Sequence, residues 1–172
     1  DGLRRCAANP SYGCFPNEIL MSPRPYKIAL NGYGRIGRCV LRALHERGAG
    51  SAIEIVALND LADQASIEYL TRFDSTHGRF PGAVAVDGDC LHINGGCVKV
   101  LRQSTPEAID WAALEVDLVL ECSGQYTSRA AAQRFIDAGA PRLLLSQPMN
   151  SEADIDATIV YGVNQQQLTG AE

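Results

Sequence analysis

Gly32, Gly34 and Gly37 have the spacing Gly-x-Gly-x-x-Gly. An apolar run over 26–30 precedes them and predicts a buried strand, and the residues over 38–44 predict a helix. In a strand–turn–helix of this kind, the first glycine permits a tight turn and the second lets the backbone approach a pyrophosphate. The third lets the helix pack close to the strand, so that the free N–H groups of the helix face the phosphates. The spacing therefore predicts a dinucleotide-binding turn, with an ordinary Gly-rich loop as the alternative.

An acidic residue follows the next predicted strand. The strand over 53–58 ends at Asn59, and Asp60 lies roughly 20 residues beyond the glycines, where an acid accepts hydrogen bonds from the ribose hydroxyls of a bound dinucleotide. Its charge repels a 2′-phosphate, and residues 61–63 contain no Arg or Lys to bind one. The sequence therefore predicts NAD rather than NADP. The alternative is that Asp60 only caps the next helix.

Predicted strands and helices alternate along most of the chain. We expect an α/β protein with a Rossmann-type, doubly wound, mostly parallel sheet and an inserted antiparallel meander over 83–102. Ligands bind beyond the carboxyl ends of such strands, where Asn31, Asp60, Ser123 and Ser146 stand. The expected parallel strands cover 26–30, 53–58, 117–121, 142–146 and 157–161. The first expected helix covers 35–47 and stops at Gly48, and a second is capped by Asp63. A third begins at a cap at Thr127 or Ser128, runs to Asp137 and is stopped by Gly139.

Composition excludes several classes of protein. The 172 residues carry a net charge of −5 and are 46% hydrophobic, which favours one folded domain. No long basic run and no apolar stretch of transmembrane length is present, so we expect neither nucleic acid nor a membrane as a partner. No metal-like cluster of His and Cys occurs either, and we therefore expect no metal site.

The cysteines fit a cytoplasmic protein. Cys39 and Cys122 lie in segments that should be buried, and we interpret them as reduced, small apolar side chains. Cys90 and Cys97 flank a predicted turn and could face each other across a hairpin, but we expect no disulfide between them. Cys122 also stands at a strand end near the predicted cleft. Nothing in the sequence supplies it with a paired base, so we interpret it as a packing residue rather than a nucleophile.

The beginning of the chain differs from the rest. Residues 1–20 mix charged residues, cysteines and prolines without periodicity, and Met21 then leads into the first predicted strand. We expect 1–20 to be a non-native or disordered extension and 21–172 to form a single domain.

Three separated motifs carry a resemblance to a known family. The segments 31–38, 73–80 and 162–164 resemble the glyceraldehyde-3-phosphate dehydrogenase family, over about 25–168. Within that family, 121–129 and 157–165 resemble the branch that acts on D-erythrose 4-phosphate. We rank this branch first, and the branch of glycolysis second.

The resemblance implies roles for individual residues around NAD. Arg35 and Ile36 would present backbone N–H groups to the pyrophosphate, and Asp60 would hold the adenosine ribose. Ser123 and Gly124 stand where the family has a Thr-Gly pair that lines the cofactor cleft, and Ser146 would lie near the nicotinamide. The complete set of expected cofactor-binding residues is Asn31, Gly32, Gly34, Arg35, Ile36, Gly37, Asp60, Ser123, Gly124 and Ser146.

The resemblance also implies an activity for a longer protein. The family oxidises a phosphorylated aldose: a Cys adds to the aldehyde, hydride passes to NAD, and a thioester remains. Water then releases 4-phosphoerythronate, for pyridoxal phosphate synthesis, or phosphate releases a bisphosphate. That Cys follows the segment matching 162–164 in the family and is not in this sequence, so we expect an NAD-binding domain cut off before the catalytic domain of a homotetramer. The alternative is a stand-alone nucleotide-binding or interaction module without catalysis.

Overall fold

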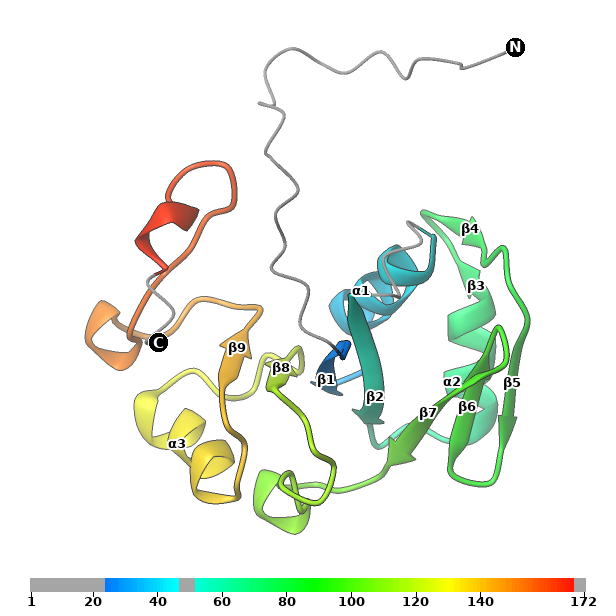
Figure 1. Cartoon of the computed structure of the whole chain (residues 1–172), viewed down its shortest axis with the longest axis horizontal. Coiled ribbons are helices and arrows are strands. Elements are labelled where there is room, and N and C mark those ends of the chain that lie inside the picture. The colour runs from blue at the N-terminus through cyan, green and yellow to red at the C-terminus, as the bar shows by residue number, and fades with distance from the viewer. Residues whose placement is uncertain (1–23, 47–51, 169–172) are drawn as a thin grey trace.

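The computed structural model describes residues 24–46 and 52–168. Within these residues a seven-stranded sheet has the order β5-β6-β7-β2-β1-β8-β9, and β3 and β4 form a separate short ribbon (Figure 1). The strands are β1 (Tyr26–Asn31), β2 (Ile53–Asn59), β3 (Phe73–Asp74), β4 (Gly78–Arg79), β5 (Val84–Asp87), β6 (Cys90–Ile93), β7 (Gly96–Leu101), β8 (Leu118–Glu121) and β9 (Leu143–Leu145). The helices are α1 (Arg35–Glu46), α2 (Gln64–Arg72) and α3 (Arg129–Asp137), with short 3-10 turns at Pro106–Ala108, Glu152–Asp154 and Gln165–Gln167.

The central strands are parallel and end together. β7, β2, β1, β8 and β9 pair in parallel, whereas β5, β6 and β7 form the antiparallel meander. Asn31, the last residue of β1, lies opposite Asn59 of β2 and Glu121 of β8. The polar residues that end three neighbouring strands therefore meet at one edge of the sheet.

Apolar residues pack on both faces of the sheet. Leu30 belongs to a buried cluster with Leu41 of α1 and Ile67 of α2, while its neighbour Ala29 belongs to a second cluster around Phe135 of α3. Successive side chains of a strand point to opposite faces, so the two clusters lie on opposite sides of the sheet. Figure 1 shows α3 beside β9, and α2 beside the meander at the other end. The predicted doubly wound fold with an inserted meander is confirmed.

The predicted helix ends are largely confirmed. The Asp63 carboxylate accepts the N–H of Ser66 at 2.8 Å and caps α2, and the Ser128 hydroxyl caps α3. Gly139 follows α3 with φ of +95°, a conformation in which glycine is not strained. The proposed stop at Gly48 lies outside the described residues, as do the expected extension 1–20 and Met21. No helix in the described part of the chain is long and apolar enough to cross a membrane.

The strand expected over 157–161 is wrong. This segment pairs with no strand, and Thr158, Val160 and Tyr161 are exposed. The Asn164 side chain instead accepts the N–H of Val160 at 2.6 Å and donates to the carbonyl of Thr158 at 2.9 Å. These bonds engage backbone groups that a strand would offer to a neighbour, and the orange-to-red chain leaves the sheet beyond β9 (Figure 1).

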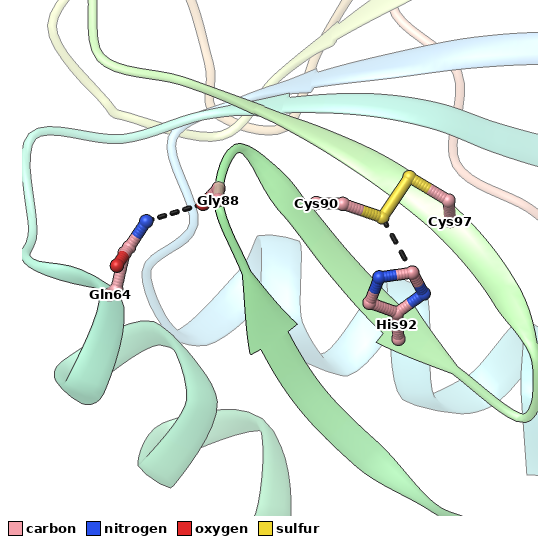
Figure 2. Close-up of a disulfide and its surroundings, with 5 residues drawn as sticks. All are labelled: Gln64, Gly88, Cys90, His92 and Cys97. Carbon is pink, nitrogen blue, oxygen red and sulfur yellow. Dashed lines mark hydrogen bonds between the residues drawn. A yellow bond between two sulfur atoms is a disulfide. The ribbon is translucent and has the colours of Figure 1, made fainter.

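The expectation that Cys90 and Cys97 remain unpaired is also wrong. They form a disulfide between β6 and β7, with 5.6 Å between their Cα atoms (Figure 2). The register explains the pairing: Cys97 lies opposite His92, so Cys90, two residues before His92, is a diagonal neighbour on the same face. Figure 2 also shows the His92 ring beside the Cys90 sulfur, at 3.7 Å. Cys39 and Cys122 are free, as expected, and are half-buried rather than fully buried.

We expect Phe135→Ala to be among the most destabilising substitutions in α3. The Phe135 ring is fully buried and contacts the rings of Trp111 and Tyr126, with centroids 5.9 and 4.8 Å away. Removing it leaves a cavity and should lower the free energy of unfolding by about 3–5 kcal/mol. Urea titration followed by circular dichroism measures this loss. A loss below about 1 kcal/mol would contradict the packing described here.

Candidate functional site

The glycine turn lies against the end of β8. A Cβ added to Gly32 would come within 2.6 Å of the backbone nitrogen of Ser123, and one added to Gly37 would come within 2.3 Å of the carbonyl oxygen of Gly32. Gly32 also has φ of +92°. A Cβ on Gly34 would meet no atom within 4 Å. Two glycines are therefore required by close packing, whereas the third faces open space where a ligand's phosphates could approach.

Helix α1 points its first turn at this open space. It begins at Arg35, directly after Gly34, and the first bond that closes its backbone ladder is donated by Arg38 to the carbonyl of Gly34 at 3.1 Å. The N–H groups of Arg35 and Ile36 precede that bond and have no acceptor within the helix. Both residues are exposed. These N–H groups and the helix dipole create a site for a negatively charged group.

Tyr33 anchors the middle of the turn. Its side chain is buried, and its hydroxyl lies 2.8 Å from the Thr71 hydroxyl of α2. Thr71 donates its own hydrogen to the carbonyl of Ile67, so the Tyr33 hydroxyl is the donor. Burial raises the pKa of Tyr33 to about 12. Arg38 also donates to the Tyr33 carbonyl at 3.2 Å, and the turn is thus attached to both helices.

Asp60 lies beside the glycine turn. One oxygen of its carboxylate accepts the N–H of Tyr33 at 2.7 Å, and the other accepts the N–H of Ala62 at 2.9 Å. The cap of α2 is Asp63, so the alternative that Asp60 merely caps this helix is wrong. Asp60 therefore links the end of β2 to the glycine turn by a hydrogen bond, and it places a negative charge at the open edge.

A buried hydrogen-bond network lies beneath the turn. Glu121 is fully buried, and its carboxylate accepts hydrogen bonds from the side chain of Asn31 and from the N–H and hydroxyl of Ser123. Asn31 in turn accepts from Asn59 at 2.8 Å, and Asn59 exchanges two hydrogen bonds with the backbone of Gln103. Asn31, which we expected to face a cofactor, thus has both ends of its amide engaged inside the protein.

Sequence reasoning missed the central residue of this network. From the sequence, Glu121 is expected in a strand and in the segment 121–129, and Asn59 at the end of a strand, but neither is expected to take part in the site. The available signal was their alignment: Asn31, Asn59 and Glu121 each end a predicted parallel strand, so all three must meet at one edge.

The remaining expected residues lie on the other side of the turn. Ser123 and Gly124 follow β8, and Gly124 has φ of +76° with open space where a Cβ would stand. Ser146 follows β9, and its N–H donates to the carbonyl of Glu121 at 2.9 Å. The structure therefore brings the ten expected residues to one edge, with Asp60 and Ser146 on opposite sides of the glycine turn. Among the described residues no cluster of His, Cys, Asp and Glu is placed to hold a metal ion.

Two hollows on the described surface lie away from the glycine turn. One is lined by Leu44, His45, Glu54 and Cys97, and another by Arg79 and Phe80 among other residues. Neither includes a residue of the glycine turn or of the ends of β1 and β8. The chemistry of the edge described above rests on the backbone N–H groups of α1 and on Asp60.

Cys122 is placed for packing rather than for chemistry. Its side chain is half-buried against the core and lies near Gly37. Burial raises the pKa of its thiol, a hydrogen bond with Ser146 lowers it by less, and the Glu121 charge adds a smaller rise. A raised pKa means less thiolate at neutral pH than an ordinary cysteine has, and only the thiolate is a nucleophile.

We therefore expect Cys122 to react slowly with iodoacetamide at neutral pH, and to react faster only at a more alkaline pH than an ordinary cysteine requires. Peptide mass spectrometry after timed labelling measures the rate at this single position. A short unfolded peptide with one cysteine, labelled in the same tube, supplies the reference rate. Labelling of Cys122 at pH 7 as fast as the reference would contradict the assignment as a packing residue.

Comparison with known proteins decides the family. Residues 26–129 match the family model "Glyceraldehyde 3-phosphate dehydrogenase, NAD binding domain". The chain belongs to the glyceraldehyde-3-phosphate dehydrogenase family. Two relatives from Cupriavidus necator, its chromosomal and its plasmid glyceraldehyde-3-phosphate dehydrogenase, are 51% and 50% identical over 138 residues. These residues make up 80% of this chain and 40% of each relative, so the chain corresponds to less than half of their length.

The residues at the open edge fit the cofactor of this family domain, which is NAD. A Cβ at Gly34 would occupy space that is empty in the structure, next to the unpaired N–H groups of α1. Asp60 supplies acceptor oxygens about where a dinucleotide's adenosine ribose lies in this fold. The prediction of NAD, made from the glycine spacing and Asp60, is confirmed at the level of the family.

Proposed function

We propose that this chain holds the NAD of a dehydrogenase that oxidises glyceraldehyde 3-phosphate. Membership of the family carries the proposal, together with relatives of that name that are about half identical to the chain. Support from the fold comes from the open space at Gly34 and the helix N-terminus behind it.

The chain's own residues bind and orient the cofactor in this proposal. The N–H groups of Arg35 and Ile36 bind the pyrophosphate, and Asp60 accepts hydrogen bonds from the adenosine ribose while its charge disfavours a 2′-phosphate. Ser123 and Ser146 line the side of the nicotinamide. When bound, NAD supplies the acceptor for the hydride of the aldehyde. The full proposed set is Asn31, Gly32, Gly34, Arg35, Ile36, Gly37, Asp60, Ser123, Gly124 and Ser146, with Asn31, Gly32 and Gly37 acting through the shape of the turn.

The nucleophilic Cys belongs, in this proposal, to a further domain of a longer protein. The relatives extend well beyond the matched region, since the match covers 40% of each of them. We place the substrate's phosphate and the nucleophile in that domain, and we propose that the longer protein is a homotetramer.

Glyceraldehyde 3-phosphate takes precedence here over D-erythrose 4-phosphate, which the sequence favoured. The relatives named above carry the former name. The erythrose expectation partly rested on the segment 121–129. Two of its residues have structural roles: the Glu121 carboxylate accepts a hydrogen bond from Asn31, and Ser128 caps α3. These structural roles give no reason to prefer a four-carbon substrate.

A rate assay on the longer protein that contains this domain tests the proposal. NADH formation at 340 nm is followed with glyceraldehyde 3-phosphate or D-erythrose 4-phosphate, each with and without inorganic phosphate. We expect the higher kcat/KM with glyceraldehyde 3-phosphate, and a rate that requires phosphate. A higher kcat/KM with erythrose 4-phosphate, independent of phosphate, would overturn the choice of substrate. Light scattering of the same sample checks the homotetramer.

A further inference from the structure

We propose that Glu121 is a positioning residue for NAD. It acts through a network of hydrogen bonds, and the backbone of Gln103 determines which atoms donate and which accept along that network. The inference rests on the proposed binding of NAD at the glycine turn. The network runs from Gln103 through Asn59 and Asn31 to Glu121 and ends at Ser123. It therefore crosses beneath the whole site, from the side of Asp60 to the side of Ser146.

The backbone of Gln103 leaves Asn59 one orientation. Its N–H donates to Oδ1 of Asn59 at 2.8 Å, and its carbonyl accepts from Nδ2 of Asn59 at 3.0 Å. A flipped amide would place a donor against the N–H and an acceptor against the carbonyl, losing both bonds. Asn59 must therefore also present Nδ2 to Asn31, and Asn31 must accept with Oδ1, at 2.8 Å.

The orientation of Asn31 then determines what residue 121 must be. With Oδ1 turned to Asn59, Asn31 presents Nδ2 to Oε2 of Glu121. The other oxygen, Oε1, accepts the N–H of Ser123 at 2.6 Å and also the Ser123 hydroxyl. Donors therefore face both oxygens, and a carboxylate satisfies them. An amide of the same shape does not, because in either orientation its NH₂ group would face a donor.

The network is connected to the turn that holds the pyrophosphate. The N–H of Cys122 donates to the carbonyl of Asn31 at 2.7 Å, and Gly32 packs so closely on Ser123 that a Cβ there would lie 2.6 Å from the Ser123 nitrogen. A shift of Ser123 or Asn31 consequently moves the start of the turn. Because Asn31, Asn59 and Glu121 are at most 7% exposed, water cannot replace a lost bond without entering the core.

The hydrogen bond between Asn31 and Glu121 can be reversed by two isosteric substitutions. Glu121→Gln places its NH₂ against a donor, and Asn31→Asp places a second carboxylate against Glu121. Combined, they restore every bond: the introduced amide donates to the introduced carboxylate, its oxygen accepts from Ser123, and the carboxylate's other oxygen accepts from Asn59. The double variant also has the same net charge as the wild type.

The experiment compares the wild-type chain, both single variants and the double variant by isothermal titration with NAD and by thermal unfolding. We expect each single variant to bind NAD about ten- to a hundredfold more weakly, and the double variant to return to within about threefold of the wild type. If a single variant does not fold, recovery of both folding and affinity in the double variant supports the proposal. A double variant that folds and binds as weakly as the single variants overturns it.

A matched control separates positioning from stability. Leu91→Ala is in β6 of the meander, with β7 and β2 between it and β1, and should lower the melting temperature without changing the affinity for NAD. Single variants that lose stability but bind NAD like the wild type would overturn the inference while leaving the proposed function intact. A wild-type chain that does not bind NAD at millimolar concentration would overturn the proposed function, and the inference with it.

Discussion

Gly37→Ala is expected to weaken the binding of NAD by about a hundredfold or more, equivalent to ~2.8 kcal/mol. The added Cβ would lie 2.3 Å from the carbonyl oxygen of Gly32, and that atom belongs to the backbone of the turn itself. No rotation of a side chain relieves such a contact, so α1 must move away from β1. The N–H groups of Arg35 and Ile36 then leave the place where they converge on the pyrophosphate. Isothermal titration with NAD measures the loss.

Gly34→Ala is the matched control for stability, because it adds the same methyl group three residues earlier. Nothing lies within 4 Å of the added atom, so the domain should fold with nearly unchanged stability. Its methyl group projects into the space assigned to the phosphates, and the affinity for NAD should still fall. Comparable unfolding curves for the wild type and Gly34→Ala, with a clear loss for Gly37→Ala, are expected. Equal NAD affinity in all three proteins would contradict the assignment of the turn.

Asp60→Asn is expected to reduce the preference for NAD over NADP at least tenfold. The carboxylate accepts the N–H groups of Tyr33 and Ala62, and its charge is the one that disfavours a 2′-phosphate. An amide keeps one acceptor oxygen but places NH₂ against the other N–H, so NAD affinity falls as the repulsion of NADP is removed. The ratio of the two dissociation constants, measured by titration on the same protein, reports this change.

Asp63→Asn provides the control for charge alone. Asp63 lies three residues away and caps α2, and asparagine is an equally good cap. The ratio of the NAD and NADP dissociation constants should remain at its wild-type value in this variant. An equal change of the ratio in both variants would mean that general electrostatics, rather than contact at Asp60, sets the preference.

Local patterns in the sequence predicted the parts of the fold that depend on local geometry. The glycine spacing predicted the turn, and the structure shows that Gly32 and Gly37 pack where no Cβ fits. Asp63 and Ser128 were recognisable as helix caps because capping involves only the next three residues. Such features are encoded within a few positions of one another.

Features that join distant segments could not be predicted in the same way. Glu121 and Asn31 are 90 positions apart, and nothing near either residue shows that a carboxylate must meet an amide. The strand expected at 157–161 failed because apolar residues are compatible with a strand but do not determine whether the segment pairs with the outermost strand, β9. The disulfide of Cys90 and Cys97 depended on the register of β6 and β7, which a turn signal alone does not determine.

Residue-level titration of this chain with NAD tests the central assignment most directly. In ¹H–¹⁵N correlation spectra, the amide signals of Gly34, Arg35, Ile36 and Gly37 should shift most, in a saturable way, and NADP should shift them less at equal concentration. Saturable shifts confined to another surface, or spectra unchanged at millimolar NAD, would contradict the account of the glycine turn as the pyrophosphate site.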